Sequence, residues 1–218
     1  MESARLREVL PTLFGRVAIQ IGRVGKMDLM DASLIATRGV LDSGCGGVAP
    51  DLWALAEALP LDTRSVDLCL LPHTLDFAED PHQVLRETQR VLAPEGHLVL
   101  LGFNPMSLWG LRHALGSRTA PPWCGRFIHL SRIKDWLRLL DFEWVGGQML
   151  YYRPPIAHDG MRDRLHVLER IGDRWWPLGG AAYLLVARRR IAGMMPLRPA
   201  WRRRRTLARP YPAGARRA

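Results

Sequence analysis

This 218-residue sequence has few cysteines and no long apolar run. Its cysteines, Cys45, Cys69 and Cys124, have the spacing of neither a metal site nor a disulfide framework, which favours free thiols in a reducing compartment. The longest apolar run, residues 178–187, is too short to cross a bilayer, and the first residues lack the apolar segment of a secretory signal. These absences predict a cytoplasmic protein without a transmembrane segment.

Acidic residues are missing from the last part of the chain. From Arg188 onward there are eleven arginines and no acid, whereas the rest of the chain has 20 basic and 21 acidic residues, so the net charge of +10 belongs to this end. Residues 191–218 are rich in arginine and proline and are predicted to form a disordered tail. The tail is a candidate for binding nucleic acid or an anionic surface, and a merely solubilising tail is the alternative. The four candidate residues are Arg202, Arg203, Arg204 and Arg205.

Residues 1–190 are long enough for one folded domain with a full core. Residues 66–71 form an almost wholly apolar run, which is typical of a parallel strand buried on both faces. Asp80 and Pro81 are predicted as the N-cap and first residue of a helix, and residues 97–102 as a second buried strand. A strand–helix–strand unit of this kind predicts an open α/β sheet.

The order AEALPL, SVDLCLL, LDFAEDPHQVLRE and RVLAPEGHLVL over residues 56–100 resembles the second half of class I S-adenosylmethionine (SAM)-dependent methyltransferases. In that family an acid starts the fourth strand, here Asp67, and a helix ending in RVL-x-P-x-G leads into the fifth. The later segments FNPMSLWGLR, DWLRLLDFE and RWWPLGGAAYLLVARRR extend the resemblance to short bacterial proteins of methyltransferase type 11. The resemblance implies a Rossmann-like, mostly parallel α/β sheet with an antiparallel last strand, helices on both faces, and SAM as methyl donor.

The turn after the first predicted strand, residues 17–21, departs from the family's pattern. The resemblance implies an acid at the end of this strand and then alternating glycines, whose backbones approach the methionine part of SAM. This sequence has Gln20 in place of the acid; Gly22 matches, and Gly25 stands one place out of register. Gly22 and Gly25 are the candidate cofactor contacts, and a plain tight turn without a ligand is the alternative.

A second glycine-rich segment, residues 42–47 (DSGCGG), is closer in letters to the family's loop. The interval between it and Leu59 is too short for the helices and strands that must intervene. Residues 38–41 are therefore predicted as the second strand, with Asp42 at its carboxyl end, where an acid would hydrogen-bond the ribose hydroxyls. A loop that replaces a lost helix is the open alternative. The interval after Gly22 is predicted to hold a short helix, and residues 51–54 the third strand.

Three further positions bear on the site that the resemblance implies. Leu55 stands where the family commonly has an aspartate, and the backbone N–H of Ala56 is a candidate contact to the adenine ring. Glu57 is the nearest acid. His73 follows the fourth strand, where ligands of open α/β sheets lie, and is a candidate cofactor contact and general base. A structural histidine with satisfied hydrogen bonds is the alternative for His73.

Beyond residue 105 the pattern is less informative. Trp109 and Leu111 with Arg112 indicate a helix that lies over the site as a lid or substrate wall. Ser131 is predicted as the N-cap of a second helix that continues to Leu140. A strand over residues 142–152, interrupted by two glycines, a helix over 156–172 and an antiparallel strand over 181–186 complete the domain.

Two functions remain open from the sequence. One is a SAM-dependent methyltransferase with an unknown acceptor. The other is a protein of the same fold that has lost the cofactor, whose pocket is filled by Leu55 and Val24, and that binds nucleic acid through its tail.

Overall fold

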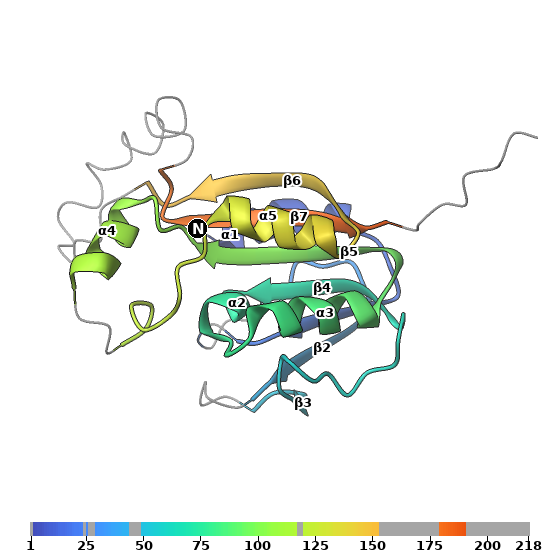
Figure 1. Cartoon of the computed structure of the whole chain (residues 1–218). Helices are drawn as coiled ribbons and strands as arrows, with labels where there is room; N and C mark the ends of the chain where they lie inside the picture. The colour runs from blue at the N-terminus through green and yellow to red at the C-terminus, as the bar shows by residue number, and fades with distance from the viewer. Residues whose placement is uncertain are drawn as a thin grey trace, which may run out of the picture.

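The computed structural model describes residues 2–23, 25, 29–43, 49–116, 120–152 and 179–190. A sheet of seven strands organises them, in the spatial order β3-β2-β1-β4-β5-β7-β6 (Figure 1). Strands β1 to β5 are parallel, and β7 runs antiparallel between β5 and β6. The predicted α/β class, with a mostly parallel sheet and an antiparallel last strand, is confirmed.

The strands are β1 (Val17–Ile21), β2 (Thr37–Asp42), β3 (Leu52–Trp53), β4 (Val66–Pro72), β5 (Leu92–Phe103), β6 (Phe142–Leu150) and β7 (Ala182–Arg189). The helices are α1 (Glu2–Val9), α2 (Thr74–Phe77), α3 (Pro81–Val91), α4 (Leu108–Leu115) and α5 (Leu130–Leu139), with a 3₁₀ turn at Leu10–Thr12.

Helices cover both faces of the sheet, as Figure 1 shows, with α3 and α5 in front and α1 behind. Leu6 and Leu10 pack behind it against Leu70 of β4 and Val99 of β5. The front core includes the buried sides of α3 and α5, together with Leu100 of β5. Leu70, Val99 and Leu100 are fully buried, as their apolar runs predict.

Two aspartates define where elements begin. The Asp80 carboxylate accepts hydrogen bonds from the backbone N–H groups of His82 and Gln83, so it is the N-cap of α3, as predicted. The Asp67 carboxylate at the start of β4 accepts from the N–H groups of Arg16 (2.7 Å) and Val17 (3.0 Å). This second pair of bonds fixes the first residue of β1 beside β4.

Three local expectations differ from the structure. Residues 29–36, the longest described stretch of the connection from β1 to β2, form bends, a turn and irregular backbone, whereas a short helix was predicted in this interval. Helix α5 begins at Leu130, and its N-cap is His129, so the prediction of Ser131 as N-cap is wrong. The helix thus begins two residues earlier than predicted, and Leu130 in its first turn packs against the front core. The glycines of β6 form a bulge near Gly146 within a continuous strand.

The predicted helix over 156–172 and the tail over 191–218, with Arg202 to Arg205, lie outside the described residues. Among the helices that the structure does describe, none has the length and apolar character needed to span a bilayer.

Candidate functional site

The carboxyl ends of three neighbouring strands bring the predicted site residues to one edge of the sheet. Gly22 follows β1, Asp42 ends β2, and His73 follows β4. Because β1 lies between β2 and β4, this edge is the point where the strand order reverses, which is where open α/β sheets bind ligands. The topology supports Gly22, rather than residues 42–47, as the turn after the first strand.

Gly22 lies close to two other segments, at Leu41 of β2 and Thr74 of α2. Its N–H donates to the Leu41 carbonyl (2.7 Å), and its φ of +84° favours glycine. A Cβ at this position would lie 2.9 Å from the hydroxyl oxygen of Thr74, which itself donates to the Ile21 carbonyl. The requirement for glycine here therefore comes from protein contacts.

Gly25 differs from Gly22 in its surroundings. Its φ is +64°, and no described heavy atom lies within 4 Å of the position that a Cβ would take. Among the described residues, therefore, none occupies the space beside the Gly25 backbone.

Gln20 lies at the end of β1 with 1% of its surface exposed. Its side-chain amide nitrogen donates to the Gly22 carbonyl (2.9 Å), whereas its Oε1 has no hydrogen-bond partner among the described residues. A buried acceptor without a donor lowers the stability of the folded state. The unpaired Oε1 therefore indicates a position at which a ligand would supply the hydrogen-bond donor. The sequence shows only that Gln20 stands in place of an acid. That its side-chain oxygen has no hydrogen-bond partner can be seen only in the folded structure.

Asp42 is partly exposed, and its Oδ1 accepts the N–H of Ser43 (2.9 Å). It pairs with Trp53 in the register of β2 and β3. Trp53 and Leu55 are 63% and 60% exposed, so Leu55 does not fill a pocket. These side chains give the edge beside Asp42 an apolar surface.

Ala56 is half-buried and packs at the margin of the front core. The segment that follows it is held by α3, because Arg90 donates to the carbonyls of Leu59 (2.9 Å) and Leu61 (2.8 Å). The Glu57 carboxylate accepts the N–H of Glu79 (3.2 Å), so this acid faces the start of α3.

His73 is enclosed by two carboxylates. It has a φ of +57° and only 2% exposure. Its Nδ1 lies 3.0 Å from Oδ2 of Asp76, and its Nε2 lies 3.2 Å from Oε1 of Glu2 in α1. The ring stacks on Phe103 at 3.9 Å, and Asp76 also accepts the Phe103 N–H (3.0 Å).

The charge of His73 follows from this enclosure. Burial alone would lower the pKa of the imidazole, but the hydrogen bonds and charges of Asp76 and Glu2 outweigh it and raise the pKa to about 9. Burial raises the pKa of Asp76 to about 6, against the opposing effect of His73. Near neutral pH the cluster therefore consists of an imidazolium ion facing carboxylates.

A series of aromatic rings leads from His73 to α4. Phe103 stacks on Phe127 (5.0 Å), which stacks on His113 of α4 (4.3 Å). Trp109 of α4 lies 5.4 Å from Trp123 between ring centres. Helix α4 confirms the helix that Trp109, Leu111 and Arg112 indicated, and these ring contacts hold it at the same edge of the sheet as His73.

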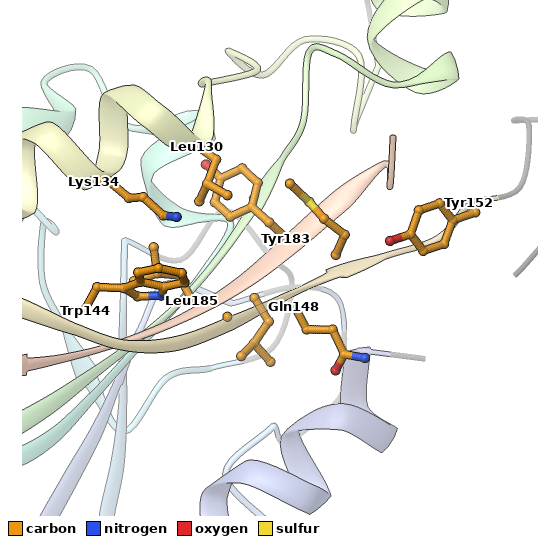
Figure 2. Close-up of a pocket in the computed structure, with 10 residues that line it drawn as sticks. Leu130, Lys134, Trp144, Gln148, Tyr152, Tyr183 and Leu185 are labelled. Carbon is orange, nitrogen blue, oxygen red and sulfur yellow. The ribbon is translucent and has the colours of Figure 1, made fainter. Parts of the chain in front are cut away.

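A cleft of about 280 Å³ lies elsewhere, between α5 and the strands β6 and β7 (Figure 2). Lys134 lies over the ring of Trp144 on one side of it, with Nζ 3.5 Å from the ring centre. Tyr152 and Tyr183 also line it. None of the predicted site residues lines this cleft. No local sequence pattern predicts the cleft, because its walls come from three separate elements. Within the described ranges, no cluster of side chains could hold a metal ion.

The known proteins to which this chain is similar include methyltransferases. Residues 49–100 match a family described as a methyltransferase domain. The uncharacterized protein YafS of Escherichia coli (strain K12) is 41% identical over 133 residues, 61% of this chain and 52% of YafS. The C-methyltransferase UbiE of ubiquinone and menaquinone biosynthesis from Hahella chejuensis is 37% identical over 92 residues, 42% of this chain and 37% of UbiE. The chain spans about half the length of the first curated relatives it matches.

Solved structures extend the likeness over most of the chain. A SAM-dependent methyltransferase from Thermotoga maritima superposes with a TM-score of 0.63 at 21% identity, covering 87% of this chain and 88% of that one. A SAM-dependent methyltransferase from Archaeoglobus fulgidus gives a TM-score of 0.60 at 18% identity, covering 86% and 92%. At these identities the likeness concerns the fold.

Proposed function

We propose that this chain, which belongs by its fold to the class I SAM-dependent methyltransferases, binds SAM at the carboxyl ends of β1, β2 and β4 and transfers its methyl group to an acceptor. The observation that carries the proposal is the unpaired Oε1 of Gln20, buried beside Gly22 at the end of β1. The ammonium group of SAM is a donor that would satisfy it.

Each part of SAM finds a complementary group in this proposal. Gln20 would accept from the ammonium group, and Asp42 from the ribose hydroxyls. The N–H of Ala56 would meet the adenine ring, and the exposed side chains of Trp53 and Leu55 would cover its faces. When bound, SAM supplies an electrophilic methyl group on a sulfonium sulfur. The protein's task is then to hold the acceptor in line with that group.

His73 has a positioning role in this proposal. An imidazolium ion has no free lone pair, so the general base that the sequence predicted would require the neutral form, a minority below a pKa of about 9. Through Asp76 the cluster holds the backbone of Phe103, and through Glu2 it holds α1. His73 would therefore fix the walls of the site.

Titration calorimetry of the full chain with SAM and S-adenosylhomocysteine tests the proposal. Because Gln20 is uncharged and Leu55 replaces an acid, we expect a Kd of about 10–100 µM or weaker. Asp42→Ala should raise the Kd about tenfold. Asp135→Ala, on the exposed side of α5, is the matched control and should leave it unchanged.

A second pair of variants probes the space beside Gly25. Gly25→Trp should abolish binding by filling it, whereas Gly25→Asn tolerates a positive φ and should retain binding. Gly22 is unsuitable for this purpose, since any side chain there meets Thr74.

The outcomes separate the two functions left open by the sequence. Absence of binding at millimolar ligand would reject the methyltransferase and favour a cofactor-deficient binding protein. Binding that persists unchanged in Asp42→Ala and Gly25→Trp would place the site elsewhere. A cytoplasmic location also remains a prediction; Cys69 and Cys124 are free thiols, which agrees with a reducing compartment.

A further inference from the structure

We propose that α4 docks this protein on an anionic lipid surface. Leu108, Leu111 and Leu115 recur at the spacing that places side chains on one face of a helix, and they are 40%, 56% and 81% exposed. Met106, just before the helix, is 59% exposed. This leucine face, Leu108, Leu111 and Leu115 with Met106, is a concentration of exposed large apolar side chains on a helix of eight residues.

The leucine face is held outward by the packing of the opposite side of α4. Gly110 is buried, and a Cβ there would lie 1.9 Å from the carbonyl oxygen of Pro105. Trp109 faces Trp123 at 5.4 Å and Tyr151 at 6.4 Å between ring centres. The hydroxyl of Ser107 accepts the Gly110 N–H and caps the first turn. The helix cannot roll to bury its leucines without breaking these contacts.

The charge around α4 suits an anionic partner. Helix α4 contains no aspartate or glutamate and carries Arg112. Arg126 follows Gly125, whose carbonyl oxygen lies 3.0 Å from Nε2 of His113 on α4. Arg112, on α4 itself, lies 4.6 Å above the ring of Trp123. Apolar side chains beside arginine and tryptophan are the features by which interfacial helices bind anionic lipid.

Other occupants fit these features less well. Nucleic acid offers charged phosphates, which leave exposed leucines without a partner. A stable protein interface buries about 800 Å² per partner, more than one short helix face provides. A lipid surface combines a small apolar contact with long-range attraction to basic residues, and this combination is what α4 offers.

Vesicle flotation of the full chain tests the proposal. Vesicles of phosphatidylglycerol and phosphatidylcholine in equal parts should bind the protein, and pure phosphatidylcholine vesicles should bind it much more weakly. The double variant Leu111→Glu/Leu115→Glu should lower the vesicle partition coefficient about tenfold or more, because it removes apolar contact and adds repulsion. Leu139→Glu is the matched control, since Leu139 on α5 is also 81% exposed.

Two further measurements keep the result specific. Circular dichroism should show equal melting temperatures for the wild type, the double variant and Leu139→Glu, since all the changed side chains are exposed. Replacing Arg202 to Arg205 by alanine in the full chain measures the contribution of the tail. Wild-type binding by the double variant would overturn the proposal, as would binding that depends on the four arginines alone. A dimer that the double variant converts to a monomer in size-exclusion chromatography would show a protein interface instead.

Discussion

His73 carries a charge because of two residues that face it, Asp76 three positions later and Glu2 in the first helix. The same side chain in an exposed loop would titrate near pH 6.5. Its burial without these carboxylates would favour the neutral form. The property that matters at the residue scale is therefore the set of neighbours that folding assembles.

The raised pKa of His73 predicts a loss of stability in alkali. A group whose pKa is about 9 when folded and 6.5 when unfolded stabilises fully below pH 6.5, and the contribution disappears as pH rises through 9. We expect the free energy of unfolding to fall by up to about 3 kcal/mol over this range. Urea titrations at a series of pH values measure it.

His73→Gln should remove most of this alkaline slope, and His82→Gln, an exposed histidine of α3, should retain it. The raised pKa of Asp76 acts in the acid range, where stability falls as pH rises from about 4 to about 6, so the measurement begins at pH 6.5. An identical slope in wild type and His73→Gln would contradict the assignment.

At the scale of elements, carboxylates at the starts of strands and helices decide where the segments lie. Asp80 satisfies two N–H groups at the first turn of α3, a local interaction. Asp67 instead joins β4 to the residues that begin β1, fifty positions earlier in the chain. Asp67, at the start of the fourth strand, thus has a structural function.

Asp67→Ala should destabilise the protein by about 2 kcal/mol, because two backbone donors lose a charged acceptor. Chemical denaturation measures the change, and Asp135→Ala on the exposed side of α5 serves as the control with an expected effect near zero. Equal stability of the two variants would mean that solvent replaces the Asp67 carboxylate without cost.

At the scale of the whole molecule, charge is divided between a nearly neutral domain and a basic end. The domain buries two apolar clusters, one on each side of the sheet. The last residues hold eleven arginines from Arg188 onward and no acid. Stability and polyanion binding are therefore expected to reside in different parts of the chain.

Deletion of residues 194–218 should leave the melting temperature almost unchanged and sharply reduce affinity for RNA or DNA. The affinity of the full chain should also weaken steeply with added salt, because arginines displace counterions from phosphates. Fluorescence anisotropy with a labelled oligonucleotide measures both effects. A truncated protein that binds as tightly as the full chain would exclude the tail as the electrostatic site.

The bounds of strand β4 could be predicted within a residue, and so could the start of helix α3 and its cap at Asp80. Their signals are local: an unbroken apolar run, and an aspartate–proline pair before a periodic segment. The start of α5 was harder to predict from the sequence. The helix begins at Leu130, which packs on the core, and so it starts before Ser131.

The amino-acid sequence alone determined the class of fold, the order of its central elements and the strand ends at which Gly22, Asp42 and His73 lie, because apolar periodicity and turn chemistry act between residues close along the chain. Only the tertiary structure decided that His73 is charged, that Gln20 has an unpaired oxygen and that the leucines of α4 face outward. Each of these depends on contacts between segments distant along the chain, such as the 71 positions that separate Glu2 from His73.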